Sequence, residues 1–242
     1  MEHFFKKMLK ILSNKKYRKY PSKTGEGGLT QEQQRALNIG AINAEQTMYF
    51  CDSLETGEDK NEVKSMLEKY YSIIDRESAL ETLCWLRDEG HRIYFESIKE
   101  FVAGYATAID NTYLDQEKGV RAYQYIQNLN DTIGILCENQ FISSKSDLHY
   151  KSILGWDMGR LVLVTRCCYE CGYVSEEEAW DYISNALIAC SKIYSNWEEF
   201  AAGYVIGRSM WGGNNMSLPG IITIIKDLLS DSESPWLNIQ FK

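Results

Sequence analysis

The stretch SEEEAWDYISNALIACSKIY, residues 175–194, decides the fold class of this chain. Its first residue, Ser175, is followed three positions later by Glu178, which is the pattern of a capping box. In a capping box the serine hydroxyl accepts a hydrogen bond from a first-turn amide, and the carboxylate accepts one from the amide of the cap residue. Apolar residues then recur at helical spacing. The stretch therefore predicts a helix that begins after Ser175 and ends at about Tyr194.

Similar signals lie on both sides of this helix. Capping residues stand at Thr30 and Asp75, and glycines that end helices stand at Gly90 and Gly172. Only three prolines occur among the 242 residues, of which 44% are hydrophobic and 25% charged, a composition typical of a folded helical protein. We therefore predict an all-α protein, a single compact domain of about eight to ten helices. The other predicted helices span residues 30–50, 62–71, 75–90, 95–109, 116–138, 146–172 (expected at the centre), 196–211 and 218–229.

The first 28 residues are predicted to form an arm and a linker. Residues 1–24 carry eight basic side chains against one acidic one, so they contribute +7 to the net charge of −8, and the remainder contributes −15. Apolar residues between Phe4 and Leu12 recur at helical spacing with lysines between them, which predicts a basic amphipathic helix. The glycine-rich stretch 20–28 follows as a linker. The domain is therefore expected to span residues 29–242.

Two locations are open for this amphipathic arm. We favour the arrangement in which its apolar stripe packs against the acidic body of the protein. The alternative is contact with an anionic membrane surface through residues 1–24. Because the body has its own caps and apolar patterns, deletion of residues 1–24 is expected to leave it folded.

Charge and cysteine content limit the classes of function. An acidic body repels nucleic-acid phosphates and attracts basic proteins, so we expect no nucleic-acid partner. No apolar run is long enough for a transmembrane helix, and the first residues lack the order of a secretory signal. Seven cysteines, an odd number, are typical of reduced thiols. These features predict a cytoplasmic protein.

The usual signatures of catalysis and cofactor binding are missing from the sequence. It contains no Walker loop and no GxGxxG, GxSxG or HExxH pattern. Cys168 and Cys171 form a CxxC pair, but the pair ends a predicted helix and lacks the second pair that a zinc site needs. We therefore interpret both as buried thiols. His3 and His149 have no metal-binding partner at helical spacing, so we expect no metal site and no cofactor.

Six ionisable residues stand in unexpected positions. Five are charged side chains within helical sequence that is otherwise apolar, and the sixth is a histidine at a helix junction. They are Asp157, Arg160, Arg166, Glu178, Arg208 and His91. We favour a buried ion-pair network that fixes the helix arrangement, and the alternative is a small polar pocket for an anionic or carboxylate-bearing ligand. His91 is interpreted as a residue that stabilises a helix end rather than a catalytic one.

An ordered series of motifs resembles a known protein family. The motifs are Tyr71-Ser72-Ile73-Ile74-Asp75, Leu83-x-Trp85-Leu86 with Gly90-His91-Arg92, Trp156-Asp157-x-Gly159-Arg160, Gly172-Tyr173-x-Ser175-x-x-Glu178-Ala179-Trp180, Ser195-x-Trp197-x-x-Phe200, Gly207-Arg208-x-x-Trp211 and Ser234-Pro235-Trp236. From about residue 29 to the C-terminus the chain resembles DUF1266, a bacterial family of unknown function. The resemblance implies a bacterial cytosolic domain and transfers no catalytic residue.

Two classes of function remain. We favour a non-enzymatic, acidic helical protein that binds another protein, and one form of this hypothesis is an immunity protein that binds a basic bacterial toxin. The alternative is an enzyme or small-ligand sensor that uses the embedded charges together with His91. Mutual pairing of these side chains in a dry core favours the first class, whereas a deep pocket lined by them favours the second.

Overall fold

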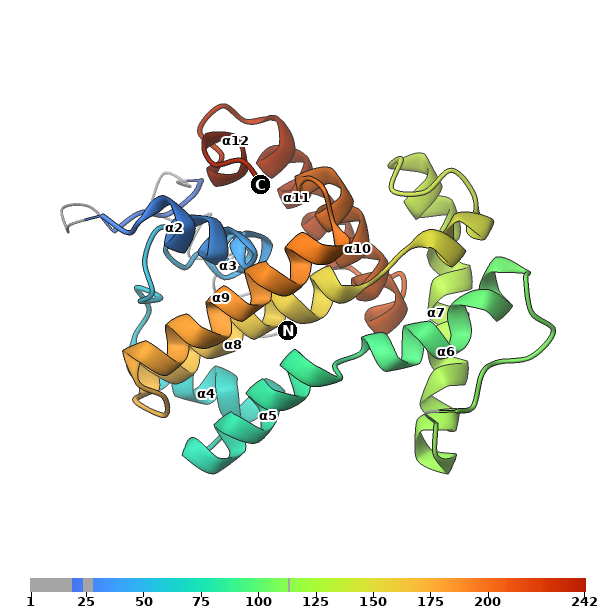
Figure 1. Cartoon of the computed structure of the whole chain (residues 1–242), viewed down its shortest axis with the longest axis horizontal. Helices are drawn as coiled ribbons and strands as arrows, with labels where there is room; N and C mark the ends of the chain where they lie inside the picture. The colour runs from blue at the N-terminus through green and yellow to red at the C-terminus, as the bar shows by residue number, and fades with distance from the viewer. Residues whose placement is uncertain (1–18, 24–27, 113) are drawn as a thin grey trace.

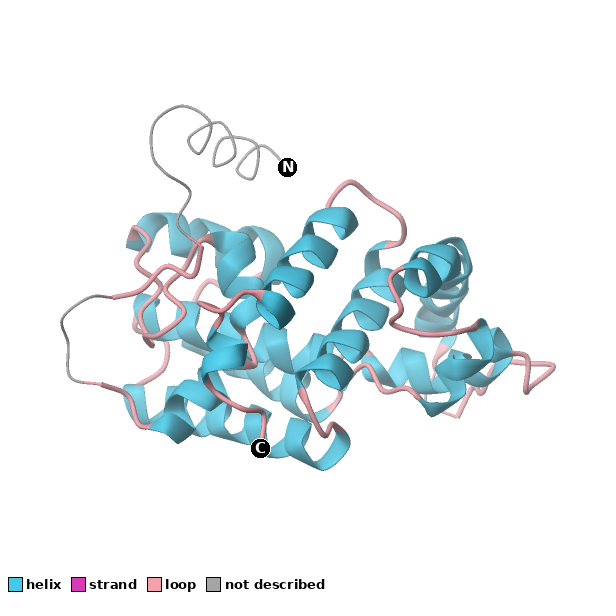
Figure 2. Ribbon diagram, turned by 90° about the horizontal axis from the view of Figure 1, so that it is seen from above, coloured by secondary structure: helices cyan, strands magenta, loops and turns pink. Residues whose placement is uncertain are grey.

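Every regular element is a helix within residues 19–23, 28–112 and 114–242, which are the residues that the computed structural model describes. Figure 2 shows these helices joined by loops. The predicted all-α class is confirmed. Within the same ranges no helix is both long enough and apolar enough to cross a bilayer.

Helix α8, Leu154–Cys171, lies at the centre of the molecule, and almost its whole length is buried. Its sequence explains this position, because apolar residues surround the helix on all sides instead of forming one stripe. In Figure 1 it runs beside α9, with α4 and α5 below. The helices that pack against α8 are α3 (Ala41–Thr47), α4 (Lys60–Tyr71), α5 (Arg76–Asp88), α9 (Glu176–Ile193) and α10 (Trp197–Gly212).

The remaining helices extend this core in two directions. At one end of Figure 1, α6 (Arg92–Ala103) packs against α7 (Gln116–Glu138) and the 3-10 helix η1 (Lys145–Tyr150), and α7 also contacts α10. Toward the other end, α11 (Leu218–Ser230) packs on α3 and α10. The two short helices there are α12 (Pro235–Asn238), against α11, and α2 (Gln31–Asn38), against α9.

The predicted caps are present in the structure. Thr30, Asp75 and Ser175 are the N-cap residues of α2, α5 and α9, and each forms the reciprocal hydrogen bonds of a capping box. Gly172 follows α8 in the left-handed conformation, with a φ of 78°. Short-range chemistry therefore sets these helix ends.

One predicted helix, residues 30–50, is wrong because the chain breaks into α2 and α3 at Gly40. The Asn38 carbonyl accepts a hydrogen bond from the Trp236 indole at 2.9 Å, so it is engaged by a distant residue. A Cβ at Gly40 would lie 2.6 Å from Cγ1 of Val162, which shows that α8 approaches the backbone closely there. The packing of α8 and α12 thus ends α2 where apolar spacing alone predicts continuation.

The predicted helix over residues 146–172 is also divided, into η1 and α8. Between them the Tyr194 hydroxyl donates to the Ser152 carbonyl at 2.9 Å and accepts from the Gly155 amide at 2.9 Å. This buried side chain satisfies backbone groups that would otherwise need helical partners. Helix α6 differs from the predicted 95–109 at both ends, because it begins at Arg92 and Gly104 ends it with a φ of 89°.

Residues 19–23, assigned above to the arm and linker, pack on the body. The Tyr20 side chain is buried, and its backbone amide donates to the Glu45 carboxylate at 2.7 Å. Lys19 pairs with Asp231 at 3.0 Å and Asp227 at 3.2 Å on the α11 side. Packing therefore begins ahead of the expected boundary at residue 29. The rest of the predicted arm and linker, residues 1–18 and 24–27, lies outside the described residues.

Candidate functional site

The centre of the candidate site is Asp157 on α8, whose side chain is completely buried. Its carboxylate accepts hydrogen bonds from the backbone amides of His91 at 2.9 Å and Arg92 at 3.0 Å, and from Nη1 of Arg92 at 3.2 Å. These amides belong to the start of α6, where a negative charge is stabilised by unpaired N–H groups. Gly90, with a φ of 63°, leaves space that a Cβ would take from this carboxylate. Asp157 therefore joins α8 to the junction of α5 and α6.

Arg160 lies one turn further along α8 and extends this cluster. Its Nη1 is 2.8 Å from Nδ1 of His91 and 3.8 Å from Oδ1 of Asp157. The guanidinium lies over the Trp156 ring at 4.9 Å and the Tyr71 ring at 5.9 Å. Because a guanidinium only donates, the His91 Nδ1 must accept and the ring is neutral. Burial lowers the pKa of His91, and the nearby Asp157 carboxylate opposes this shift, so the net direction agrees with a neutral ring.

Three of the six predicted residues therefore meet: His91, Asp157 and Arg160. The sequence analysis missed Arg92, which supplies two donors to the same carboxylate. The sequence feature that could have identified Arg92 is its position directly after His91 at the start of a helix, where a backbone amide and a long side chain can reach one acceptor.

Arg208 on α10 is a buried cation with little compensation. Its side chain donates through Nη2 to Asn215 at 2.9 Å and to the Ser217 hydroxyl, and the guanidinium lies 5.3 Å from the centre of the Trp211 ring. Among the described residues no carboxylate pairs with it, and its Nη1 has no acceptor. Burial lowers the pKa of this guanidinium, and Tyr204 opposes the shift. A buried charge without a counter-ion is costly, so Arg208 needs an explanation.

Arg160 and Arg208 line the same cavity, which we call the arginine pocket. Its volume is about 310 Å³, and it lies among α3, α4, α8 and α10. Trp156 lines this pocket, and its indole Nε1 is buried and has no acceptor within the described part of the chain. The residues that line the pocket are Asn43, Gln46, Thr47, Tyr49, Met66, Tyr70, Tyr71, Trp156, Arg160, Leu163, Arg208, Trp211 and Ser217.

Arg166 is buried but lies apart from this pocket. Its guanidinium donates to the backbone carbonyls of Phe50 at 2.7 Å, Leu54 at 3.2 Å and Glu55 at 2.7 Å. Burial lowers the pKa of Arg166. The side chain therefore holds the loop after α3 against α8 by hydrogen bonds to carbonyls.

Glu178 lies at the surface, at the start of α9. It pairs with Arg76 through two hydrogen bonds of 2.6 and 2.9 Å, and also accepts from the amide of Ser175 as predicted. The Arg76 pair lowers the pKa of Glu178 to about 2. The pair links α5 to α9 and takes no part in the pocket. The six predicted residues therefore divide between a buried cluster, a pocket and two separate structural contacts.

The predicted CxxC pair is buried. Cys168 and Cys171 are free thiols near the end of α8, as the sequence indicates. Burial raises the pKa of Cys168 to about 12. A thiol held in its protonated form is a poor nucleophile.

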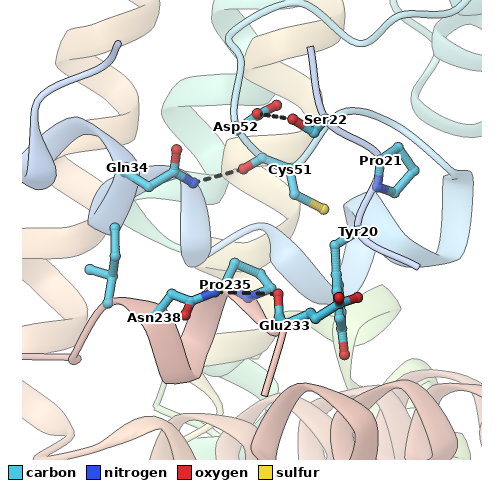
Figure 3. Close-up of a pocket in the computed structure, with 10 residues that line it drawn as sticks. Tyr20, Pro21, Ser22, Gln34, Cys51, Asp52, Glu233, Pro235 and Asn238 are labelled. Carbon is cyan, nitrogen blue, oxygen red and sulfur yellow. Dashed lines mark hydrogen bonds between the residues drawn. The ribbon is translucent and has the colours of Figure 1, made fainter. Parts of the chain in front are cut away.

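A second cavity, of about 270 Å³, lies between residues 20–22, the loop after α3 and α12 (Figure 3). The hydroxyl of Tyr20 has no partner among the described residues, but other polar side chains of this cavity bond within the protein. The Asp52 carboxylate accepts from the Ser22 hydroxyl, Gln34 donates to a loop carbonyl at 2.9 Å, and Asn238 donates to the Glu233 carbonyl at 3.4 Å. Unlike the arginine pocket, this cavity has no buried cation without a counter-ion among its described lining residues.

Comparisons with known proteins agree with the resemblance seen in the motifs. The family model described as protein of unknown function (DUF1266) matches residues 66–241. The uncharacterized protein YbeR of Escherichia coli strain K12 is 24% identical over 147 residues, which are 60% of this chain and 56% of YbeR. The chain thus matches little more than half the length of that relative. No solved structure matches the chain.

Proposed function

Because the chain belongs to the DUF1266 family, a family of unknown function, we propose its function from its own geometry: it binds a small anionic molecule in the arginine pocket. The observation that carries the proposal is Arg208, a cation that is 4% exposed and has no carboxylate partner among the described residues. An anion in the pocket would supply the missing counter-charge. The role is one of binding, without a catalytic step.

The charges around the pocket support this proposal. Asp157 is shared between Arg92 and Arg160, so this cluster holds two cations and one carboxylate. Arg208 adds a third cation. An arginine side chain keeps its proton in proteins, so the net charge of these groups is positive at neutral pH. This local positive charge contrasts with the net charge of −15 that residues 25–242 carry as a whole.

The buried donors support it as well. Nη1 of Arg208 and Nε1 of Trp156 both lack acceptors within the described ranges. Buried donors in proteins normally have partners, and each unsatisfied one is costly. A bound carboxylate or phosphate has several acceptor sites and is the group that arginine recognises best.

The proposal is tested by thermal unfolding with inorganic phosphate and with acetate, on the wild type, Arg208→Met and Arg87→Met. Arg87 is the matched control because it also lies over an aromatic ring, that of Tyr182, but pairs with Asp88 at the surface. A ligand that binds only the folded state raises the melting temperature. Phosphate also stabilises proteins by exclusion from their surface, and this non-specific stabilisation raises the melting temperatures of all three proteins equally.

We expect both anions to raise the melting temperatures of the wild type and Arg87→Met by more than that of Arg208→Met. Equal rises in all three proteins, or none, would overturn the proposal. Binding would then have to be sought elsewhere on the molecule.

We also propose, on charge alone, that the acidic body binds a basic protein. The net charge of −15 outside residues 1–24 favours the encounter, and the immunity form of the hypothesis adds only that the partner is a toxin. Copurification from the native host tests it. A reproducible basic partner that is released by salt supports it, and a partner that is not basic contradicts it. We also propose that the protein acts in the cytosol, which its seven free cysteines support.

A further inference from the structure

Five of the thirteen residues that line the arginine pocket are aromatic. Trp156, Trp211, Tyr70 and Tyr71 all line it, from α4, α8 and α10. Two of these side chains are largely exposed in the free protein, Trp211 at 47% and Tyr70 at 54%. Exposed aromatic rings beside a cavity are typical of surfaces that a ligand covers.

The arginines and indoles form one series of contacts. Arg160 lies over Trp156 at 4.9 Å, Trp156 contacts Trp211 with ring centres 5.9 Å apart, and Arg208 lies over Trp211 at 5.3 Å. Arg160 donates from Nη1 to His91, and Arg208 donates from Nη2 to Asn215 and Ser217, so the other N–H groups of the two guanidiniums can donate to a carboxylate or phosphate. The pocket therefore combines donor edges with flat apolar walls.

The volume limits the size of the ligand. About 310 Å³ is at the small end of ligand pockets, which run from about 300 to 1,000 Å³. This space suits a molecule of one or two rings and excludes a dinucleotide. Met66 and Leu163 complete an apolar part of the lining, so a ligand that is charged throughout would leave this part unmatched.

We infer that the ligand of the arginine pocket is an aromatic acid, whose carboxylate or phosphate meets the edges of Arg160 and Arg208 while its flat ring lies against Trp211 and Tyr70. This inference rests on the proposed function and adds the chemical class of the ligand. Flat rings pack on indole and phenol rings better than puckered aliphatic rings do, by an amount worth up to about 10-fold in affinity.

The test compares phenylacetate with cyclohexylacetate and acetate, and phenyl phosphate with inorganic phosphate, by titration calorimetry on the full chain. The variants are Tyr70→Ser and Trp211→Leu. Tyr123→Ser is the matched control, because Tyr123 is 64% exposed on α7 and does not line the pocket. The carboxylate and phosphate series together show which anionic group is preferred.

We expect phenylacetate to bind about 10-fold more tightly than cyclohexylacetate in the wild type and in Tyr123→Ser. Tyr70→Ser and Trp211→Leu should lose most of this preference and keep their affinity for acetate and phosphate. Equal affinity for the flat and the puckered acid, or an equal loss for all anions, would overturn the inference and leave the proposed function standing. If none of these anions binds, the proposed function fails and the inference fails with it.

Discussion

Replacement of Asp157 by asparagine is expected to lower the free energy of unfolding by about 3 to 5 kcal/mol, the usual cost of removing one member of a buried ion pair. One carboxylate oxygen accepts from the His91 amide at 2.9 Å, and the other from the Arg92 amide at 3.0 Å. Asparagine keeps only one oxygen. Whichever way its amide turns, an NH₂ group faces a buried N–H, and Arg92 and Arg160 lose their shared counter-charge.

This change is large enough to measure by calorimetry or by circular dichroism. In a chain of this size 1 kcal/mol shifts the melting temperature by about 2 to 4 °C, so the expected fall is about 6 to 20 °C. Asp88→Asn is the matched control, because Asp88 pairs with Arg87 at 2.7 Å on the surface, where an ion pair contributes at most about 1 kcal/mol.

A melting temperature of Asp157→Asn within about 2 °C of that of the wild type would refute this reasoning, since it corresponds to no more than about 1 kcal/mol. An equal fall in Asp157→Asn and Asp88→Asn would refute it too. Either result would mean that the buried carboxylate does not hold α6 to α8.

Three further predictions concern other parts of the molecule. Arg208→Met should leave the melting temperature in the absence of ligand unchanged or higher, because the variant no longer carries the desolvation cost of a buried cation without a counter-ion; a fall like that of Asp157→Asn would contradict this. His91→Asn keeps an acceptor for Arg160 without a titrating ring. Burial places the folded pKa of His91 below its usual value of about 6.5, so the unfolded chain takes up more protons, and wild-type stability falls as the pH drops below about 6.5 and through the folded pKa. Urea unfolding from about pH 7 to pH 5 should show a smaller loss in the variant, and an identical loss would show that another group is responsible. Removal of residues 1–23 should cost about 2 to 3 kcal/mol more than removal of residues 1–18, because only the longer deletion takes away the buried Tyr20 ring and the amide donor of Glu45, and equal urea midpoints would disprove this.

The all-α class and many helix ends could be predicted from the sequence. The capping boxes at Thr30, Asp75 and Ser175 involve residues only three positions apart, so the chemistry that begins each helix is contained in a few neighbouring residues. The bounds of α7, Gln116–Glu138, agree with the prediction for the same reason, since its N-cap Asp115 accepts from an amide of the first turn.

The candidate site could be predicted in part. Asp157 and Arg160 were found because charges within an apolar helix must have partners, and their three-residue spacing puts them on one face. Spacing could not show that Arg166 bonds to loop carbonyls or that Glu178 pairs with Arg76, because those partners are 102 or more positions away in the sequence and meet only through packing. The aromatic walls of the pocket gave no separate signal, since aromatic residues at helical spacing are equally typical of a core.

The sequence by itself therefore determined the helical class, the caps and the identity of the buried charges, because each depends on residues within one or two turns of a helix. The tertiary structure alone decided where two predicted helices break and which charges pair. The Trp236 indole donates a hydrogen bond to the Asn38 carbonyl, 198 positions away in the sequence. The Tyr194 hydroxyl forms hydrogen bonds with the backbone of Ser152 and Gly155, about 40 positions away. The tertiary structure also brought Arg160 and Arg208 to one pocket and left Arg208 without a carboxylate partner. The physical reason is that a backbone carbonyl or a buried cation accepts whichever partner the packed fold brings to it, and local spacing carries no record of that partner.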